Sequence, residues 1–406
     1  MKKFALYFLV LFLIHQNSFS QNIINNWRGP DRSGHYHESG LLNEWPEGGP
    51  EMVWAFEELG IGFTSPVIEN GRIYVSGMEG DMGYIYILSM QGELKAKYPY
   101  GNEISSRYPG TRSTPTIAGN LMYVATGNGE LICMDLENGN INWSRDLFND
   151  FDGSNIRWGF TENLVIAGDL IYCAPGGDEF NIVALNRHSG EPEWSSTGEG
   201  GLSAYCSPLI IDHNGQQILT TIMQRNILGM DAQTGELLWS YPYANMRNIH
   251  PNTPVYYQGD IYYFSGYGEG GLKLRLSDDG RDVSLVWENG TVDPQLGGAV
   301  LVDGYLYASG DRNRRWFTID WQSGEITYET REIDKGNIIA ADGMLYVYTE
   351  RGELALLEPL DGSFRVVSET DITLGSDQHW AHLVIDDGIL YVRRGNALMA
   401  FDIRQS

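Results

Sequence analysis

Short apolar segments alternate with tight turns along most of the chain. In GMDAQTGELLWSYPY (229–243), one apolar segment is followed by a turn at Thr234 and Gly235, and the next segment leads to a tryptophan. Short segments bounded by Gly, Asn and Asp predict β-strands joined by tight turns. We find no long segment with the 3.6-residue period of an amphipathic helix. The pattern predicts an all-β protein.

The same arrangement recurs about every 45 residues, which is the spacing of a repeat protein. In each copy a short apolar strand precedes a glycine turn, and a strand that usually carries a tyrosine follows it. Two further strands complete the copy. Eight copies of the strand after the turn are GRIYVSG (71–77), GNLMYVATG (119–127), GDLIYCAPG (168–176), GQQILTT (215–221), GDIYYFSG (259–266), GYLYASG (304–310), GMLYVY (343–348) and GILYVRRG (388–395).

Four short strands at this period predict the blades of a β-propeller. A four-stranded sheet cannot bury both of its faces alone, so blades stack around an axis and cover one another. The fourth strand of several copies carries a large aromatic residue, which we expect to pack between neighbouring blades. These aromatic residues are Trp143, Trp194, Trp239 and Tyr328. The sequence thus predicts an eight-bladed β-propeller of four-stranded antiparallel blades.

The last copy is incomplete. After residue 395 only NALMAFDIRQS (396–406) remains, which is too little for two further strands and leaves the blade with three. The segment GGPEMVWAF (48–56) can supply the fourth strand, with Trp54 at the position of the other aromatic residues. Because an open ring would expose sheet edges, we predict closure by this N-terminal strand. Residues 48–406 are then one propeller domain, preceded by a lead-in, residues 21–47.

The first 20 residues have the pattern of a secretory signal peptide. Two lysines, Lys2 and Lys3, precede an apolar run from Phe4 to Ile14, and small residues follow at Ser18 and Ser20. The apolar run is too short for a membrane span, and no cysteine near the cut offers a lipid anchor. Residues 1–20 therefore predict export, with the mature protein periplasmic or secreted and without a membrane span.

The composition limits the partners. The net charge is −26, and removal of Lys2 and Lys3 brings it to −28. Such an acidic surface repels nucleic acid and anionic membranes, so we expect neither as a partner. The three cysteines, Cys133, Cys173 and Cys206, are an odd number among apolar or small residues. They predict buried thiols, with at most one bridge, rather than a disulfide framework.

One turn motif resembles a known family. Asp231, Thr234, Gly235 and Trp239 follow the pattern D-x-x-T-G-x-x-x-W, which resembles the tryptophan-docking repeat of the pyrroloquinoline-quinone (PQQ)-like propeller superfamily. The segment NWRGPDRSGHY (26–36) is similar to an entry motif before the first blade of bacterial members. The resemblance implies one of two functions: a quinoprotein dehydrogenase, or a non-catalytic propeller of outer-membrane protein assembly.

The residues favour the non-catalytic branch. The dehydrogenases are similar to one another in having adjacent cysteines and a calcium ion held beside a catalytic Asp, and no two cysteines are adjacent here. The acidic turn NDFDGSN (149–155) lacks the spacing of a calcium loop. The pairs His379 and His382, and His35 and His37, have no further ligand at a familiar spacing. We therefore predict no catalytic residue, no metal and no cofactor, with PQQ and calcium as the alternative.

The longer loops predict a candidate site. They all join the outer strand of one blade to the inner strand of the next, and such loops gather on one face around the channel. They are rich in basic and aromatic residues, namely Arg107, Arg112, Arg157, Trp158, Tyr205, Arg247, His250, Lys335, His379, Trp380 and His382. We expect a funnel for a small anionic or polyhydroxyl ligand. In the alternative, the cations pair with Glu103, Glu162, Asp334 and Asp377 and only hold the loops together.

The sequence thus predicts an exported, monomeric propeller that acts as a ligand-binding or protein-interaction module. Its partner would be an envelope protein, in outer-membrane protein assembly, or the small ligand of the funnel. The alternative is a quinoprotein-like dehydrogenase or a carbohydrate-active enzyme that uses the funnel.

Overall fold

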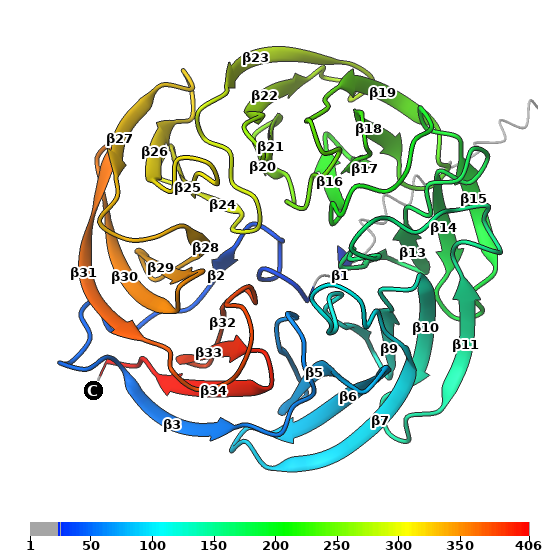
Figure 1. Ribbon diagram of the computed structural model, residues 1–406. Coiled ribbons are helices and arrows are strands. Elements are labelled where there is room, and N and C mark those ends of the chain that lie inside the picture. Colours follow the sequence, from blue (N-terminus) through cyan, green and yellow to red (C-terminus); the bar gives the residue numbers. More distant parts are fainter. Residues whose placement is uncertain (1–22, 25, 406) are drawn as a thin grey trace, which may run out of the picture.

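The chain forms a ring of eight β-sheets, confirming the predicted eight-bladed propeller (Figure 1). The computed structural model describes residues 23, 24 and 26–405, and the predicted signal peptide lies outside this part of the chain. Every regular element within it is a strand. Neighbouring strands of each blade run antiparallel, from an inner strand near the axis to an outer strand at the wall of the ring (Figure 1). The resemblance to the PQQ-like propellers is confirmed at the level of the fold.

The blades follow one another along the chain. Blade 1 comprises β4 (Val67–Glu69), β5 (Arg72–Glu79), β6 (Met82–Ser89) and β7 (Leu94–Asn102). Blade 2 comprises β8 (Thr116–Ala118), β9 (Leu121–Ala125), β10 (Glu130–Asp135) and β11 (Ile141–Asp146). Blade 3 comprises β12 (Val165–Ala167), β13 (Leu170–Cys173), β14 (Ile182–Asn186) and β15 (Pro192–Ser196). Blade 4 comprises β16 (Leu209–His213), β17 (Gln216–Ile222), β18 (Asn226–Asp231) and β19 (Leu237–Pro242).

The second half of the ring has the same order. Blade 5 comprises β20 (Val255–Tyr257), β21 (Asp260–Ser265), β22 (Gly270–Leu276) and β23 (Val283–Asn289). Blade 6 comprises β24 (Ala299–Val302), β25 (Tyr305–Ser309), β26 (Trp316–Asp320) and β27 (Ile326–Thr330). Blade 7 comprises β28 (Gly336–Ala341), β29 (Met344–Thr349), β30 (Glu353–Leu360) and β31 (Ser363–Asp371). Blade 8 comprises β32 (Val384–Asp386), β33 (Ile389–Arg394), β34 (Ala397–Asp402) and β3 (Glu51–Phe56).

The N-terminal strand β3 closes the ring, as predicted. It pairs antiparallel with β34, and Trp54 lies opposite Ala400. The buried Arg393 of β33 strengthens the same junction, because its guanidinium donates to the carbonyl oxygens of Gly60 (3.2 Å) and Thr64 (3.1 Å) in the segment that leads from β3 into blade 1. Residues far apart in the sequence therefore join blade 8 to blade 1.

A β-bulge precedes the docking position of each outer strand. In blade 2, Trp143 lies opposite Cys133 but Ile141 lies opposite Met134, so Asn142 is the extra residue. The same shift occurs in the outer pair of all eight blades. A bulge increases the local twist and re-aims the following side chain. This geometry turns the aromatic ring toward the next blade.

The aromatic side chains also hydrogen-bond to the next blade. The indole N–H of Trp143 donates to the carbonyl oxygen of Arg187 (3.0 Å), and that of Trp194 to Ala232 (3.1 Å). The ring of Trp143 rests on Gly190, whose φ is +72° and where a Cβ would lie 2.7 Å from the indole. The turn glycine of the repeat is therefore required both by its backbone conformation and by the ring that covers it.

The other aromatic positions vary this arrangement. Trp54 donates to the carbonyl oxygen of Met90 in blade 1 (2.9 Å). Trp239 packs in the core between blades 4 and 5, but its indole nitrogen has no partner among the described residues. Tyr328 packs edge-on against Phe364 of blade 7, with ring centroids 5.2 Å apart. Trp287, which the sequence interpretation left out, donates to the carbonyl oxygen of Trp321 (3.0 Å).

Blade 7 receives its docking tryptophan from the lead-in. Its own residue at this position is Ser368, which lies opposite Leu356. Trp45 packs there instead: its backbone N–H donates to the Ser368 hydroxyl (2.8 Å), and its ring lies 6.4 Å from that of Tyr346. Tyr346 is equivalent to Tyr123, which contacts Trp143 in blade 2. The lead-in thus supplies the docking tryptophan of blade 7, although that blade comes about 290 residues later in the sequence.

The lead-in also occupies the centre of the ring (Figure 1). Its strand β1 (Ile23–Ile24) pairs with β12, and β2 (His35–Tyr36) pairs in parallel with β28. Between them Arg28 donates to the carbonyl oxygen of Ala299 (2.8 Å), and Arg32 donates to that of Pro208 (2.7 Å). Both arginines are fully buried, and burial lowers the pKa of Arg28 to about 10. They cap backbone carbonyls of different blades and so fasten the lead-in within the channel.

The three cysteines and the absence of a spanning helix can be described for residues 23, 24 and 26–405. Cys133, Cys173 and Cys206 are all buried and free, as expected for structural thiols. No helix capable of crossing a bilayer occurs among the residues that the structure describes.

Candidate functional site

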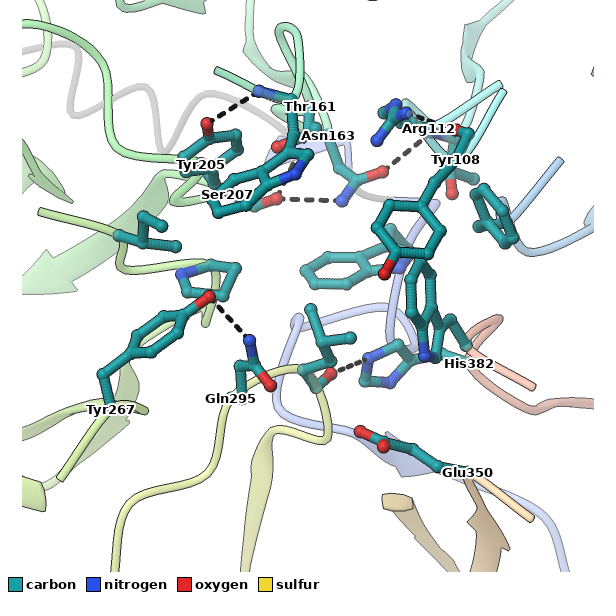
Figure 2. A pocket seen from close by; sticks show the side chains of 18 residues that line it. Tyr108, Arg112, Thr161, Asn163, Tyr205, Ser207, Tyr267, Gln295, Glu350 and His382 are labelled. Carbon is teal, nitrogen blue, oxygen red and sulfur yellow. Dashed lines mark hydrogen bonds between the residues drawn. The ribbon is translucent and has the colours of Figure 1, made fainter. Parts of the chain in front are cut away.

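A cavity of about 370 Å³ lies at the centre of the ring, above the lead-in (Figure 2). We call the face on which it lies the funnel face, formed by the loops between second and third strands and between successive blades. The opposite turn face holds the remaining turns. Trp27 of the lead-in contributes to the cavity lining together with residues from the funnel-face loops. The longer loops therefore gather around the axis.

Aromatic side chains form much of the cavity wall. Trp380 contacts Phe63 and Tyr108, with ring centroids 5.0 and 5.1 Å apart. On another side, the backbone N–H of Trp158 donates to the hydroxyl of Tyr205 (3.1 Å), and their rings lie 6.1 Å apart. The aromatic rings contact one another, so the wall holds its shape without a ligand.

Three of the lining tyrosines adopt a left-handed backbone. The φ angles of Tyr108, Tyr205 and Tyr267 are +57°, +71° and +65°. For a residue with a large side chain this conformation costs on the order of 1–2 kcal/mol. Such backbone strain is common at binding sites. Here all three strained residues place an aromatic ring in the cavity lining.

Polar side chains from the starts of the inner strands form a second part of the lining. The N–H of Thr114 donates to Asn163 Oδ1 (2.8 Å), and the N–H of Asn163 donates to Ser207 Oγ (3.1 Å). These residues occupy equivalent positions in blades 2, 3 and 4 and join each blade to the next. Across the cavity, Gln295 donates to the hydroxyl of Tyr267 (2.7 Å; Figure 2). The lining is thus fixed by hydrogen bonds between blades.

Arg112 is the arginine of the cavity lining. Its guanidinium donates to the carbonyl oxygens of Arg107 (3.1 Å) and Tyr108, while its buried Nε has no partner among the described residues. Burial lowers the pKa of Arg112, and the field of Glu103 opposes this. Within the described residues Glu103 makes no ion pair, and it accepts hydrogen bonds from the hydroxyl of Tyr100 (2.5 Å) and from the N–H of Gly127 (2.7 Å). Arg112 therefore lines the cavity as a cation that makes no ion pair within the described residues.

His382 is a neutral brace at the cavity wall. The guanidinium of Arg28 lies 3.1 Å from Nδ1 and can only donate, so Nδ1 is the acceptor and Nε2–H donates to the carbonyl oxygen of Leu296 (2.9 Å). Burial, with the nearby Arg28 charge, lowers the pKa of His382 to about 3. At neutral pH it carries no charge toward a ligand.

Two other histidines of the predicted site lie outside the cavity lining. His379 is within 2.6 Å of the Tyr348 hydroxyl, and burial lowers its pKa to about 4. His250 packs against Tyr243, with centroids 5.1 Å apart, and burial lowers its pKa to about 4 as well. Both are neutral packing residues of the surrounding loops.

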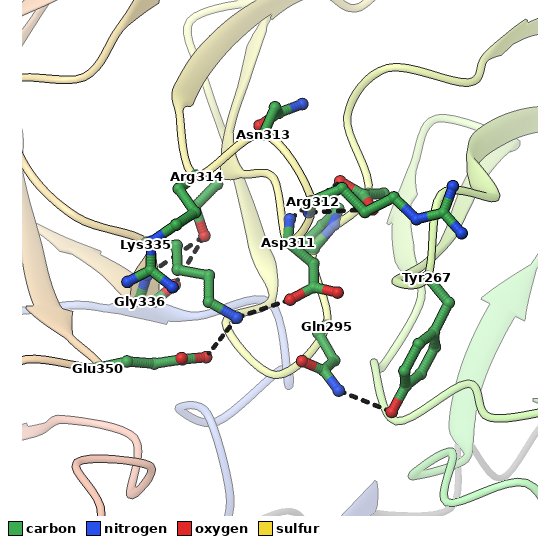
Figure 3. Close-up of polar contacts among 12 residues, drawn as sticks. Tyr267, Gln295, Asp311, Arg312, Asn313, Arg314, Lys335, Gly336 and Glu350 are labelled. Atoms are coloured by element: carbon green, nitrogen blue, oxygen red, sulfur yellow. Dashed lines mark hydrogen bonds and ion pairs between the residues drawn. The ribbon is translucent and has the colours of Figure 1, made fainter. Parts of the chain in front are cut away.

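Lys335 lies at the edge of the site in an ion-pair network (Figure 3). Its ammonium lies 2.6 Å from Asp311 and 3.1 Å from Glu350. Burial alone would lower the pKa of Lys335, but these carboxylates outweigh it and raise the pKa above its usual value. The charge of Lys335 thereby offsets the negative charge of Glu350, which lines the cavity.

The three remaining predicted arginines, Arg107, Arg157 and Arg247, are exposed in the funnel-face loops and do not line the cavity. Arg157 lies over the ring of Trp158, 4.8 Å from its centroid. None of the three makes an ion pair within the described residues. Asp334, considered as a partner, is occupied by Arg314 and by Arg351 (2.7 Å). The structure thus brings Arg112, Trp158, Tyr205, Trp380 and His382 together and leaves the other six around them.

Comparison with known proteins places this geometry in a family. A family model described as outer membrane protein assembly factor BamB matches residues 90–326 and 226–367, which together exceed half of the chain. The chain belongs to this family. The BamB of Kangiella koreensis is 28% identical over 178 residues, which are 43% of this chain and 42% of that protein. The match to the BamB of Burkholderia pseudomallei is 28% identical over 39% of this chain and 38% of that protein. The chain therefore spans less than half of the length of these curated relatives.

Solved structures support the fold more broadly. The BamB of Moraxella catarrhalis aligns with a TM-score of 0.61 at 12% identity, covering 87% of this chain and 99% of that one. A quinohemoprotein alcohol dehydrogenase from Comamonas testosteroni aligns with a TM-score of 0.69 at 11% identity, covering 92% and 79%. At these identities the likeness concerns the fold alone.

The cavity of this family member does not fit PQQ with calcium. Calcium is bound by six to eight oxygen atoms, usually from several carboxylates. Among the described lining residues Glu350 is the one carboxylate, and Lys335 occupies it. The cysteines lie in the cores between blades rather than at the cavity. In the described residues no group of three or more His, Cys, Asp or Glu could hold a metal ion. A single carboxylate also falls short of the pair used in most glycoside hydrolysis.

Several lining residues were absent from the sequence prediction. Thr114 and Ser207 each precede a proline at the start of an inner strand, and this recurring position was a usable signal. Trp27 lies in the entry motif, but no local pattern indicates that this motif enters the channel. The remaining lining residues that the prediction left out are Phe63, Tyr108, Thr161, Asn163, Ile249, Pro251, Tyr267, Gln295, Leu296 and Glu350.

Proposed function

We propose that this protein is an exported propeller that serves as a protein-interaction module in outer-membrane protein assembly. The family match carries the proposal, because it extends from the end of blade 1 to blade 7. Its relatives in K. koreensis and B. pseudomallei are outer membrane protein assembly factors. Export to the periplasm rests on the predicted signal peptide, and we expect a monomer that meets its partner through the ring surface.

The outer strands offer surfaces for such a partner. On β23, Leu285 and Val286 are 44% and 38% exposed, and on β3, Met52 and Val53 are 47% and 44% exposed. In both pairs the second residue is the bulge residue, so two adjacent apolar side chains reach solvent together. Exposed apolar side chains on strand edges are suited to protein contacts.

Two measurements test this function. Deletion of the gene should lower the amount of folded β-barrel protein in the outer membrane, and the wild-type gene should restore it. A photo-crosslinking residue at Leu285 should capture a component of the assembly machinery, whereas one at Asp303 on the turn face should not. Unchanged β-barrel levels, or the same captured proteins from both positions, would contradict the proposal.

A further inference from the structure

We propose that the central cavity binds the end of an acidic oligosaccharide, with one sugar ring between its aromatic walls and the carboxylates of further sugars on the rim arginines. This inference does not rest on the proposed role in outer-membrane assembly, which uses the outer strands. A single bound sugar chain would occupy the funnel face and leave those strands free.

The walls have the chemistry of a sugar site. The faces of aromatic rings are electron-rich and attract the C–H faces of pyranose rings. Trp158 and Trp380 provide such faces on different sides of the cavity. At about 370 Å³ the space lies at the lower end of the range of ligand pockets, which suits a small cyclic molecule.

Unused polar groups accompany these rings. The indole N–H groups of Trp27, Trp158 and Trp380 donate to no group among the described residues, in contrast to Trp143 and Trp194 of the outer wall. Hydroxyl groups of a sugar can accept from these donors. A purely apolar ligand would leave them unsatisfied, which makes a polyhydroxyl ligand the better match.

The charges select an anionic sugar. Arg112 lines the cavity, and Arg107, Arg157, Arg247 and Arg312 are exposed in the surrounding loops. None of these five arginines makes an ion pair among the described residues. Arginine forms strong, directional hydrogen bonds with carboxylates. A cationic ligand would be repelled by the positive charges of these arginines.

The placement of arginines differs between the faces. In the described loops of the funnel face, eleven cationic residues stand among seventeen acidic ones, while the turns of the opposite face have two cationic and thirteen acidic residues. The eleven are Arg107, Arg112, Arg157, Arg225, Arg247, Arg312, Arg314, Arg315, Lys335, Arg331 and Arg351. Both sets of loops are therefore acidic, but acidic residues exceed cationic ones by six on the funnel face and by eleven on the turn face. In a protein with a net charge of −26, a polyanion is repelled less at the funnel face.

The test is calorimetric titration of the purified chain with trigalacturonate, using neutral maltotriose as the matched sugar. We expect trigalacturonate to bind at least tenfold more tightly than maltotriose, with an affinity that falls as salt rises. Binding should also quench tryptophan fluorescence, because three indoles line the cavity. Absence of trigalacturonate binding at millimolar concentration, or equal affinity for maltotriose, would overturn the proposal.

Variants locate the site. Trp158→Ala and Trp380→Ala should each weaken trigalacturonate binding at least tenfold. Arg247→Gln should weaken it about threefold and reduce its salt dependence, while Arg72→Gln, at an exposed arginine that begins β5 beside the turn face, should leave both unchanged. Thermal unfolding of each variant verifies that the ring is intact. Binding that is the same in folded Trp158→Ala and Trp380→Ala as in wild type would place the ligand elsewhere and refute the inference.

Discussion

The tryptophans of the outer wall and those of the cavity differ in what their polar ends do. Trp143, Trp194 and Trp287 each donate the indole N–H to a carbonyl oxygen of the next blade. The indoles of Trp158 and Trp380 have no such acceptor among the described residues. A tryptophan whose indole N–H bonds to the next blade therefore holds two blades together. A tryptophan whose indole N–H has no partner in the protein can present its ring and its N–H to a ligand.

The backbones of the two regions differ in the same way. The outer wall repeats one device, a bulge followed by an aromatic residue over a turn, and its geometry recurs from blade to blade. The cavity instead uses a left-handed backbone at Tyr108, Tyr205 and Tyr267, in loops that share no pattern. The repeated outer strands stabilise the ring, and the loops that differ from blade to blade form the cavity lining.

Truncation of a wall tryptophan should have the largest effect. Trp287 is buried, contacts Tyr262 and donates to Trp321, so Trp287→Ala should lower the free energy of unfolding by about 3–5 kcal/mol. Trp158→Ala, at the partly exposed cavity wall, should cost about 1 kcal/mol. Urea denaturation of both variants measures the difference. Equal losses would show that the cavity tryptophan is as structural as the wall tryptophan.

The lead-in tryptophan should behave as a wall residue. Trp45 is only 5% exposed and packs between blades 7 and 8, so Trp45→Ala should cost about 3 kcal/mol. Limited proteolysis should then cleave first near blade 7. If Trp45→Ala has the stability of wild type, the lead-in does not complete that blade.

The buried carboxylate of Glu162 should make stability depend on pH. Burial raises its pKa to about 8, although Ala174 and Ser203 donate to it. The folded state therefore binds the proton more tightly than the unfolded chain, and its contribution to stability is lost progressively as the pH rises from about 4.5 to about 8. Glu162→Gln cannot ionise, so its stability relative to wild type should increase by about 1 kcal/mol per pH unit at most between pH 6 and 8. Urea midpoints across this range test it, and parallel curves for the two proteins would contradict it.

Conservative replacement should give the smallest effect and isolate the indole hydrogen bond. Trp194→Phe removes the N–H that donates to Ala232, whereas Trp239→Phe removes one that has no partner among the described residues. Trp194 is half-buried, so its loss of ring size weighs less than that of Trp239, but it also loses a hydrogen bond of about 1 kcal/mol. Urea denaturation of Trp194→Phe at one pH measures this loss, and a variant as stable as wild type would contradict a stabilising role for the bond.

The ring could be predicted from the sequence because its signals are local. A glycine turn, an apolar strand and an aromatic residue define each blade, and the deficit after residue 395 indicates the closing role of Trp54. The position of Trp45 in blade 7 could not be predicted, since it depends on a contact with Ser368 more than 300 residues away.

The site could be predicted only in part. Topology places the blade-connecting loops on one face, which is enough to bring Arg112, Trp158 and Tyr205 to the same region. Whether a side chain enters the cavity depends on the loop backbone, as the left-handed Tyr267 illustrates. His379 and His382 are close in sequence, yet only His382 reaches the cavity, because its neighbours in space are Arg28 and Leu296.

The threading of the lead-in through the channel has a consequence for how the molecule acquires its shape. The N–H of Leu42 donates to the carbonyl oxygen of Ile403 and Trp54 lies beside Ala400, so these early residues reach their places only after residues about 350 positions later have been synthesised. Contacts of such sequence separation slow folding and prolong the exposure of apolar strands. The folding chain is therefore most exposed to aggregation before β3 pairs with β34.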